Sequence, residues 1–302
     1  MDRSSASHGH SRRSIRVLGV GLLALALLLL SLGALYSLSR RDPRAVWRRA
    51  NHLVRAVVDR GTVTGQSQGA YTNVIFLHHS TGGALIAEGG VREIMTEAGF
   101  DFWDHGYNPT GLRAPDGQLV GYSYGIPGDN TDPDGLASLF AQRTYPLPVN
   151  GLSGLLQHEV IAFKSCFPAS QIDTDAELEQ YKTWYVGIRD VMDAHPDHVF
   201  IVMSPPPLHP AVTDPAAAAR ARAFAKWLSS DAYLDGHPNV FTFDLFDQLA
   251  EGDPASPDAN TLRREYRPAG TDSHPNQTAN EAVGPAFAQA VISAARSYAQ
   301  GS

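Results

Sequence analysis

The sequence predicts an α/β domain in which a parallel sheet is covered by helices on both faces, preceded by one apolar segment near the N-terminus. Apolar runs rich in β-branched and aromatic residues alternate with amphipathic helical patterns along most of the chain. These runs are apolar throughout, which indicates strands buried on both faces. Roughly 240 residues follow the N-terminal region, enough for one large domain with a well-buried core.

Five apolar runs predict five strands. Helical patterns separate them, so the strands are expected to be parallel and joined by helical crossovers. No internal repeat is present. The runs occupy residues 73–78, 100–104, 159–165, 198–204 and 239–244.

Two helical patterns are clear. Residues 175–195 place apolar side chains at three- and four-residue steps on one stripe, as a helix packed on a sheet requires. Residues 214–230 begin with Asp214 as an N-cap and Pro215 in the first turn. A further amphipathic segment, 270–291, contains Pro285 and is expected to be kinked there.

The interval 105–158 is rich in Gly, Pro, Asn and Asp and shows one short helical pattern, at residues 134–143. Long irregular insertions near strand ends are more often functional than idle. Four aromatic residues in or near it would suit stacking on a sugar ring. They are Trp103, Tyr107, Tyr122 and Tyr124.

Residues 17–38 carry no charge and are long enough to span a bilayer as a helix. They follow a tail, residues 1–16, in which "SRRSIR" resembles the twin-arginine export signal. The apolar run exceeds the core of a usual cleaved signal, which favours an uncleaved anchor. Arginines on both sides leave the orientation open, because positive-inside counting favours a cytoplasmic domain and the export-like signal favours an outside one.

The domain organisation that follows is a tail, an anchor helix (17–38), a linker (39–70) and one domain at residues 71–302. We expect the protein to be membrane-anchored with that domain outside the cytoplasm, or secreted if the apolar segment is cleaved. The net charge of −7 provides no basic surface for nucleic acid. A single cysteine, Cys166, excludes an intrachain disulfide and a cysteine-rich zinc site.

Residues that follow parallel strands meet at the carboxyl edge of the sheet, where ligands bind. Ser80 follows the first apolar run (73–78), and the late segment "GTDSHPN" contains Asp272 and His274. A serine hydroxyl becomes a nucleophile when an imidazole accepts its proton and a carboxylate holds that imidazole. Taken singly, the serine is also a helix-entry residue and "SHPN" is also a turn with an N-cap. Gly82 and Gly83 are expected to turn the backbone tightly and leave N–H groups facing a developing oxyanion.

This arrangement resembles the SGNH (GDSL-like) hydrolase superfamily, and "FLHHSTG" looks like a divergent form of its first block. The resemblance covers residues 73–299. It implies a flavodoxin-like three-layer α/β/α sandwich and hydrolysis of an acyl ester without a metal or cofactor. It makes Ser80 the nucleophile and an oxyanion donor through its own N–H, His274 the general base, and Asp272 the residue that orients the base.

The chain departs from the family pattern at the acid. The usual Gly-Asp-Ser is His78-His79-Ser80, and the acid and histidine are two residues apart instead of three. Asp244 or Asp247, after the fifth run, is therefore an alternative partner for His274.

The oxyanion hole also departs from the pattern. Gly106 is the nearest candidate for the family's second-block glycine. The third-block asparagine is replaced by "KSCF", so Lys164, Ser165 or Asn108 would fill its place.

Three functions compete on these residues. The first is a serine esterase acting on a small-molecule or carbohydrate ester. The second is a metal-dependent hydrolase in which His78 or His79 joins Asp272 and His274 around a zinc ion. The third is a catalytically inactive relative that serves as a surface-binding module. The sequence leaves the acyl group and the alcohol open.

Overall fold

The computed structural model describes residues 69–106, 111–126 and 132–301, together with helical positions 47, 50, 51 and 54. The chain divides into two units, residues 1–52 and 53–302, and the fold below is that of the second. The predicted anchor at 17–38 lies outside the described residues. Among the helices that the structure describes, none is both long and apolar enough to cross a membrane.

The second unit is an α/β fold built on a six-stranded mixed sheet, and the five predicted strands are present as its parallel members. The sheet order is β3-β2-β1-β4-β5-β6. The parallel strands are β1 (Asn73–Leu77), β2 (Asp101–His105), β4 (Val160–Lys164), β5 (Val199–Met203) and β6 (Val240–Phe243).

The prediction of a purely parallel five-stranded sheet was wrong at one edge. Strand β3 (Leu112–Arg113) pairs antiparallel with β2, so that Asp104 lies opposite Arg113. A strand of two residues is too short to leave a periodic pattern in the sequence. It forms because the chain turns back directly after β2 and covers that strand's open edge.

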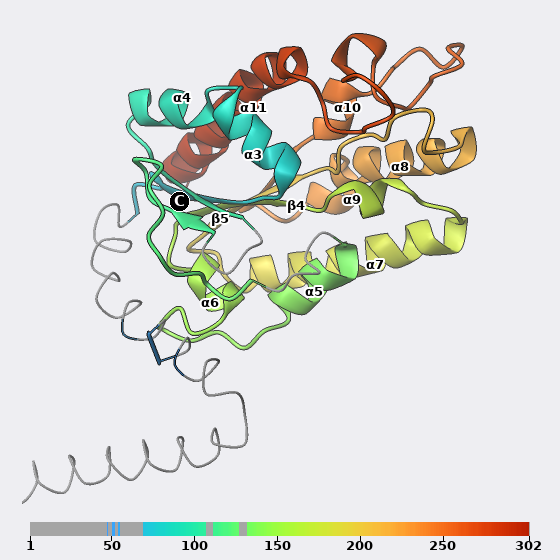
Figure 1. The fold of residues 1–302 in the computed structure, drawn as a ribbon. Helices are drawn as coiled ribbons and strands as arrows, with labels where there is room; N and C mark the ends of the chain where they lie inside the picture. Colours follow the sequence, from blue (N-terminus) through green and yellow to red (C-terminus); the bar gives the residue numbers. More distant parts are fainter. Residues whose placement is uncertain are drawn as a thin grey trace, which may run out of the picture. The chain divides into compact units, whose positions relative to one another are not determined.

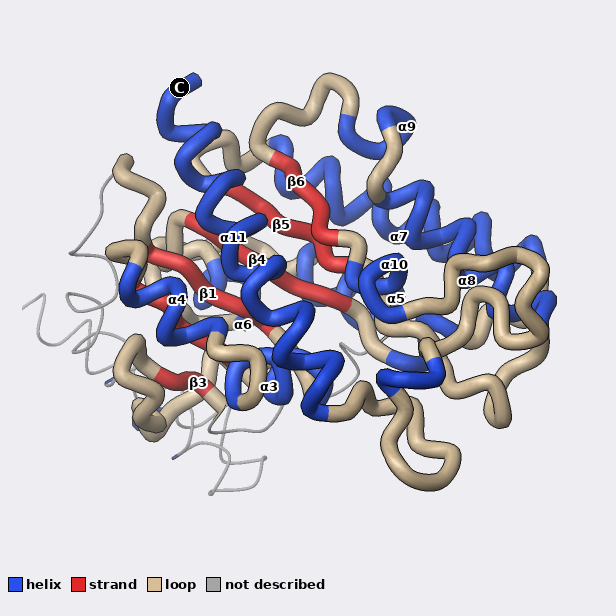
Figure 2. The backbone as a smooth tube through the Cα atoms, turned by 90° about the horizontal axis from the view of Figure 1, so that it is seen from above, coloured by secondary structure: helices blue, strands red, loops and turns tan. Residues whose placement is uncertain are grey.

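The five parallel strands, renumbered in chain order, run 2-1-3-4-5 across the sheet, which is the flavodoxin-like order. From β1 the chain first adds β2 on one side and later β4 on the other. Figure 2 shows β1, β4, β5 and β6 side by side in this order. The carboxyl ends of β1 and β4 therefore form the topological switch point, where ligands bind in folds of this kind.

Helices cover both faces of the sheet (Figure 1). One face carries α3 (Ser80–Ala87), α4 (Val91–Glu97), α10 (Leu245–Leu249) and α11 (Gln277–Gly301). The other carries α5 (Pro133–Phe140), α6 (Gly151–Leu155), α7 (Asp175–Asp193), α8 (Pro215–Leu228) and α9 (Asp231–Leu234). Two short 3₁₀ helices, η1 (Phe167–Ser170) and η2 (Arg264–Tyr266), complete the described elements.

The strands are buried from both sides, as their apolar composition predicts. In β1, Ile75 and Leu77 join the core under α5 to α9, whereas Val74 and Phe76 join the core under α3, α4 and α11. All four are fully buried. Alternate side chains of one strand thus stabilise both layers of helices.

The four helices predicted from the sequence are present as α5, α7, α8 and α11. The buried stripe of α7 is the predicted one: Leu178, Tyr181, Tyr185, Ile188 and Met192. At the start of α8 the Asp214 side chain accepts from the N–H groups of Ala216 and Ala217. The interval 105–158, expected to hold one helix, holds α5, α6 and β3. Helix α11 contains Pro285 and extends past the predicted segment to Gly301.

Candidate active site

Ser80 is the first residue of α3 and lies three residues beyond the end of β1. His79 is the N-cap, with an extended backbone (φ −122°, ψ −162°) that lifts the chain out of the strand and into the helix. The first N–H groups of a helix have no partner within it. Ser80 therefore stands at the switch point, exposed, beside backbone donors of the first turn.

The loop that precedes α11 brings His274 to Ser80. The Nε2 atom of His274 lies 2.7 Å from Ser80 Oγ, and its Nδ1 atom lies 2.7 Å from Asp272 Oδ1. A carboxylate only accepts, so Nδ1 carries the proton and Nε2 is left to accept from the serine hydroxyl. This is the tautomer that a general base needs.

The two-residue spacing of Asp272 and His274 is accommodated by a local turn. The backbone N–H of His274 donates to Asp272 Oδ1 at 3.0 Å, so the carboxylate folds over its own backbone two residues on. The same oxygen thereby reaches the imidazole. This backbone N–H, and next the imidazole, hold the pKa of Asp272 below its usual value, which keeps it ionised at neutral pH.

The site is open to solvent. The side chains of His274 and Asp272 are 44% and 57% exposed. Ser80 is exposed as well. All three side chains are therefore accessible to solvent.

Sequence reasoning missed the residues that hold the histidine loop. The ring of Phe167, directly after β4, meets the His274 ring edge-on, with centroids 5.0 Å apart. Ser273 Oγ accepts from the backbone N–H of His209 at 2.9 Å. Asn276 caps α11 by accepting from Ala279 N–H, and its amide donates to backbone carbonyls around η2. Of these, the cap alone was foreshadowed by the "SHPN" pattern.

The alternative acids are bound elsewhere. Asp244 Oδ1 accepts from Ser204 Oγ at 2.8 Å and from the N–H of Asp247, which makes Asp244 the N-cap of α10. Asp247 forms an ion pair with Arg222 at 2.6 Å. Asp272 is therefore the carboxylate that the structure brings to His274.

The described candidates for a second oxyanion donor, Gly106, Lys164 and Ser165, form their hydrogen bonds with residues other than Ser80. The N–H of Gly106 donates to Gly111 O at 3.2 Å. Ser165 is buried and its hydroxyl accepts from Tyr185. Lys164 is fully buried, and its Nζ donates to the carbonyl of Ser165 at 3.3 Å. Burial lowers the pKa of Lys164, and the Cys166 thiol opposes that effect. Asn108 lies outside the described residues.

Gly82 and Gly83 do not serve the turn for which the sequence suggested them. Both lie inside α3, and neither has a positive φ. A Cβ on Gly82 would lie 2.4 Å from the His78 Cβ and 2.9 Å from the Phe76 ring. Position 82 requires glycine because the first turn of α3 packs directly on these two side chains.

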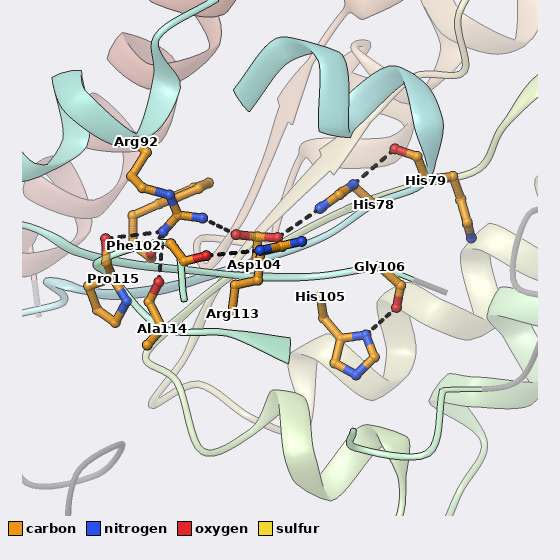
Figure 3. Close-up of polar contacts among 11 residues, drawn as sticks. His78, His79, Arg92, Phe102, Asp104, His105, Gly106, Arg113, Ala114 and Pro115 are labelled. Atoms are coloured by element: carbon orange, nitrogen blue, oxygen red, sulfur yellow. Dashed lines mark hydrogen bonds and ion pairs between the residues drawn. The ribbon is translucent and has the colours of Figure 1, made fainter. Parts of the chain in front are cut away.

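The histidines before Ser80 do not join His274 as a metal site. His78 Nε2 lies 3.1 Å from Asp104 Oδ2, and the His79 ring points away from this pair (Figure 3). In the described part of the chain, one group of three His, Cys, Asp or Glu side chains has donor atoms within 4.8 Å of one another. It consists of His195, Asp197 and His198, which precede β5 at the opposite edge of the sheet.

The aromatic residues expected to stack on a sugar belong to the core. Trp103, Tyr122 and Tyr124 are 4%, 5% and 1% exposed, and all three lie in the cluster under α5 to α9. Tyr107 lies outside the described residues. The expectation was wrong for the three described rings because the interval 105–158 folds back onto the sheet.

Comparison with known proteins gives structural likenesses only. No protein-family model matches the chain, and no curated protein sequence matches it. A protein from Bacteroides fragilis described as a "putative acylhydrolase" is similar at 12% identity and a TM-score of 0.44, covering 72% of this chain and 85% of its own. A protein from Streptococcus pneumonia described as a "putative platelet activating factor" is similar at 12% identity and a TM-score of 0.43, covering 83% and 100%. At TM-scores this low, the assignment of function rests on this chain's own geometry.

Proposed function

We propose that the protein is a serine esterase of the SGNH type, with Ser80 as nucleophile, His274 as general base and Asp272 as the residue that orients it. One observation carries the proposal. The three side chains form a continuous hydrogen-bonded chain, Ser80 to His274 to Asp272, at 2.7 Å for each link. It lies at the switch point of a sheet with flavodoxin-like strand order.

The chemistry follows from these contacts. As Ser80 Oγ bonds to the acyl carbon, its proton passes to His274 Nε2, and the carbonyl oxygen becomes an oxyanion. The C–O bond to the alcohol then breaks, and His274 returns the proton to the departing alcohol. Water repeats both steps on the acyl-enzyme and releases the acid. Asp272 stays ionised throughout and stabilises the imidazolium that forms between the two transfers.

The oxyanion requires donors aimed at it before the reaction begins. The backbone N–H of Ser80, in the first turn of α3, is the donor that this proposal uses. Removal of one such donor typically costs about 10²–10³ in kcat.

The open site supports an ester carried on a large alcohol. Exposed His274 and Asp272 leave room for a bulky leaving group, for which an O-acylated carbohydrate is the class we propose. An anchor at residues 17–38 would hold the domain at the outer face of a membrane, where such polymers occur. The carbohydrate ester and the membrane anchor are parts of our proposal that the geometry of the three side chains does not supply.

A second candidate is an inactive relative that binds its ligand at the same edge. It is favoured by the oxyanion candidates Gly106, Ser165 and Lys164, whose polar groups are bound elsewhere.

An assay of ester hydrolysis separates the serine esterase from the inactive relative. Full-length protein is assayed with p-nitrophenyl acetate, p-nitrophenyl butyrate and acetylated sugars, beside Ser80→Ala and His274→Ala. The esterase account expects turnover that both substitutions abolish and that EDTA leaves unchanged. Loss of turnover on EDTA treatment, with both variants active, would establish the metal-dependent alternative.

A further inference from the structure

A buried charged network lies beneath the first turn of α3 and ends at the peptide that carries the Ser80 N–H. Asp104, at the end of β2, is 3% exposed. Its Oδ1 accepts from Arg92 of α4, and its Oδ2 accepts from His78 Nε2 at 3.1 Å. A buried carboxylate of this kind is tolerated because both oxygens are paired with charged or ring N–H donors.

Arg92 is itself fixed from several directions. Its second guanidinium nitrogen donates to the carbonyls of Phe102, Ala114 and Pro115 at 2.7, 2.9 and 3.2 Å (Figure 3). Helix α4, strand β2 and the segment after β3 therefore meet at one side chain. Asp104, and through it His78, is held by a rigid frame.

His78 connects this rigid frame to the backbone just before Ser80. Its Nδ1 atom lies 2.9 Å from the carbonyl oxygen of His79. Both partners of the ring, this carbonyl and the Asp104 carboxylate, are acceptors only. The ring therefore lies between two hydrogen-bond acceptors, one beside each nitrogen.

The His79 carbonyl and the Ser80 N–H belong to one planar peptide unit. A bond that fixes the direction of the carbonyl also fixes the direction of the N–H on the other side of the plane. Gly83 N–H donates to the same carbonyl at 2.9 Å as the first bond of α3. The His78 ring thus adds a second anchor to the unit that supplies the oxyanion donor.

We propose that His78, held by Asp104 and Arg92, is a positioning residue that orients the His79–Ser80 peptide so that the Ser80 N–H faces the oxyanion. The inference rests on the proposed esterase function. It also accounts for Gly82, since a Cβ at this position would lie 2.4 Å from the His78 Cβ.

The test uses three substitutions of His78 in the full-length protein, assayed with p-nitrophenyl acetate. Asparagine can place an amide N–H near the position of Nδ1 and keep the bond to the His79 carbonyl. Glutamine can reach the position of Nε2 and keep the bond to Asp104 while losing the carbonyl. His78→Ala loses both. The matched control is His158→Ala, which removes another buried histidine that is hydrogen-bonded through both ring nitrogens, at the other edge of the sheet.

We expect kcat to fall by about 10² in His78→Ala and His78→Gln, to recover at least tenfold in His78→Asn, and KM to change less than threefold. His158→Ala is expected to lower the melting temperature at least as much and to leave kcat per folded molecule unchanged. If Asn and Gln variants have equal kcat, or if kcat follows the folded fraction in all four variants, the positioning role is overturned while the esterase stands. An inactive wild-type protein overturns the esterase, and the positioning role with it.

Discussion

Two histidines at opposite edges of the sheet have the same hydrogen-bonding pattern and very different surroundings. At the carboxyl edge, His274 Nδ1 donates to Asp272 and Nε2 faces the Ser80 hydroxyl, each at 2.7 Å. At the amino edge, His158 Nδ1 donates to Asn73 Oδ1 at 2.8 Å and Nε2 faces the Tyr124 hydroxyl at 2.9 Å. Both rings are therefore held in the same tautomer.

Burial and charge separate the two. His158 is 1% exposed, and burial lowers its pKa to about 3, so it stays neutral and takes no proton at neutral pH. His274 is exposed and lies against an ionised carboxylate. The same constellation is buried and neutral at one edge, and at the other edge it is exposed beside a carboxylate, as the proposed general base requires. Geometry alone does not make an acid–base group.

The largest effect is expected at the nucleophile. Ser80→Ala removes one exposed hydroxyl and almost no packing, so kcat should fall by about 10⁴ or more while the melting temperature stays within a degree or two. Tyr124→Phe removes the matching hydroxyl at the buried histidine and should do the reverse, lowering stability and leaving kcat unchanged. Steady-state kinetics and thermal denaturation measure both. Comparable kcat losses in the two variants would break the comparison.

The second effect concerns the carboxylate. Asp272→Asn keeps the size of the side chain and removes the charge that stabilises protonated His274, so kcat should fall by about 10³–10⁴. Asp244→Asn is the control, because Asn caps a helix as well as Asp does, so this variant is expected to change neither kcat nor the capping of α10. Hydrolysis by Asp272→Asn at the wild-type rate would show that another group serves His274.

The third effect concerns how the free energy of unfolding depends on pH. His158 has a folded-state pKa of about 3 and an ordinary value of 6.5, so the unfolded chain binds the extra proton between these values. The free energy of unfolding should therefore fall as the pH decreases from 6.5 toward 3, by about 2 kcal/mol between pH 6.5 and 4.5.

Urea denaturation at several pH values measures this slope. His158→Gln should flatten it by one proton. An unaltered slope in His158→Gln would mean that other groups carry the acid sensitivity.

The smallest effect is expected from the N-terminal region. Deletion of residues 1–45 removes the apolar segment and leaves both histidine networks in place, so kcat/KM should stay within about twofold and the truncated chain should be soluble. Circular dichroism and the ester assay check this. Recovery as an aggregate without helices and strands would show that the domain needs the deleted part to fold.

The parallel strands and the place of Ser80 could be predicted because each leaves a local signal. Five apolar runs predicted the five parallel strands to within one residue, and Ser80 follows directly from the first of them. Asp272 and His274 precede the last helix instead of following a strand, and the sequence left Asp244 and Asp247 open as partners of His274. Strand β3 could not be predicted, since a strand of two residues carries no period.

The sequence did not show which polar residues become buried. Asp104 follows an apolar run, as a site residue would, yet it is 3% exposed and ends in a network with Arg92 and His78. Tyr122 and Tyr124 lie in a stretch rich in loop-forming residues and are core. Burial of this kind is decided by how the interval 105–158 folds back on the sheet, and that folding depends on tertiary contacts.

The central claim, that Ser80 is a nucleophile activated by His274, is tested most directly by reaction of the full-length protein with a fluorophosphonate. The serine oxygen bonds to phosphorus, fluoride leaves, and the proton passes to His274. Mass spectrometry of the digested protein should find one phosphonyl group per chain, on Ser80, with labelling slowed at least 10²-fold in His274→Ala and absent in Ser80→Ala. A label on another residue, or none on a folded protein, would contradict the account.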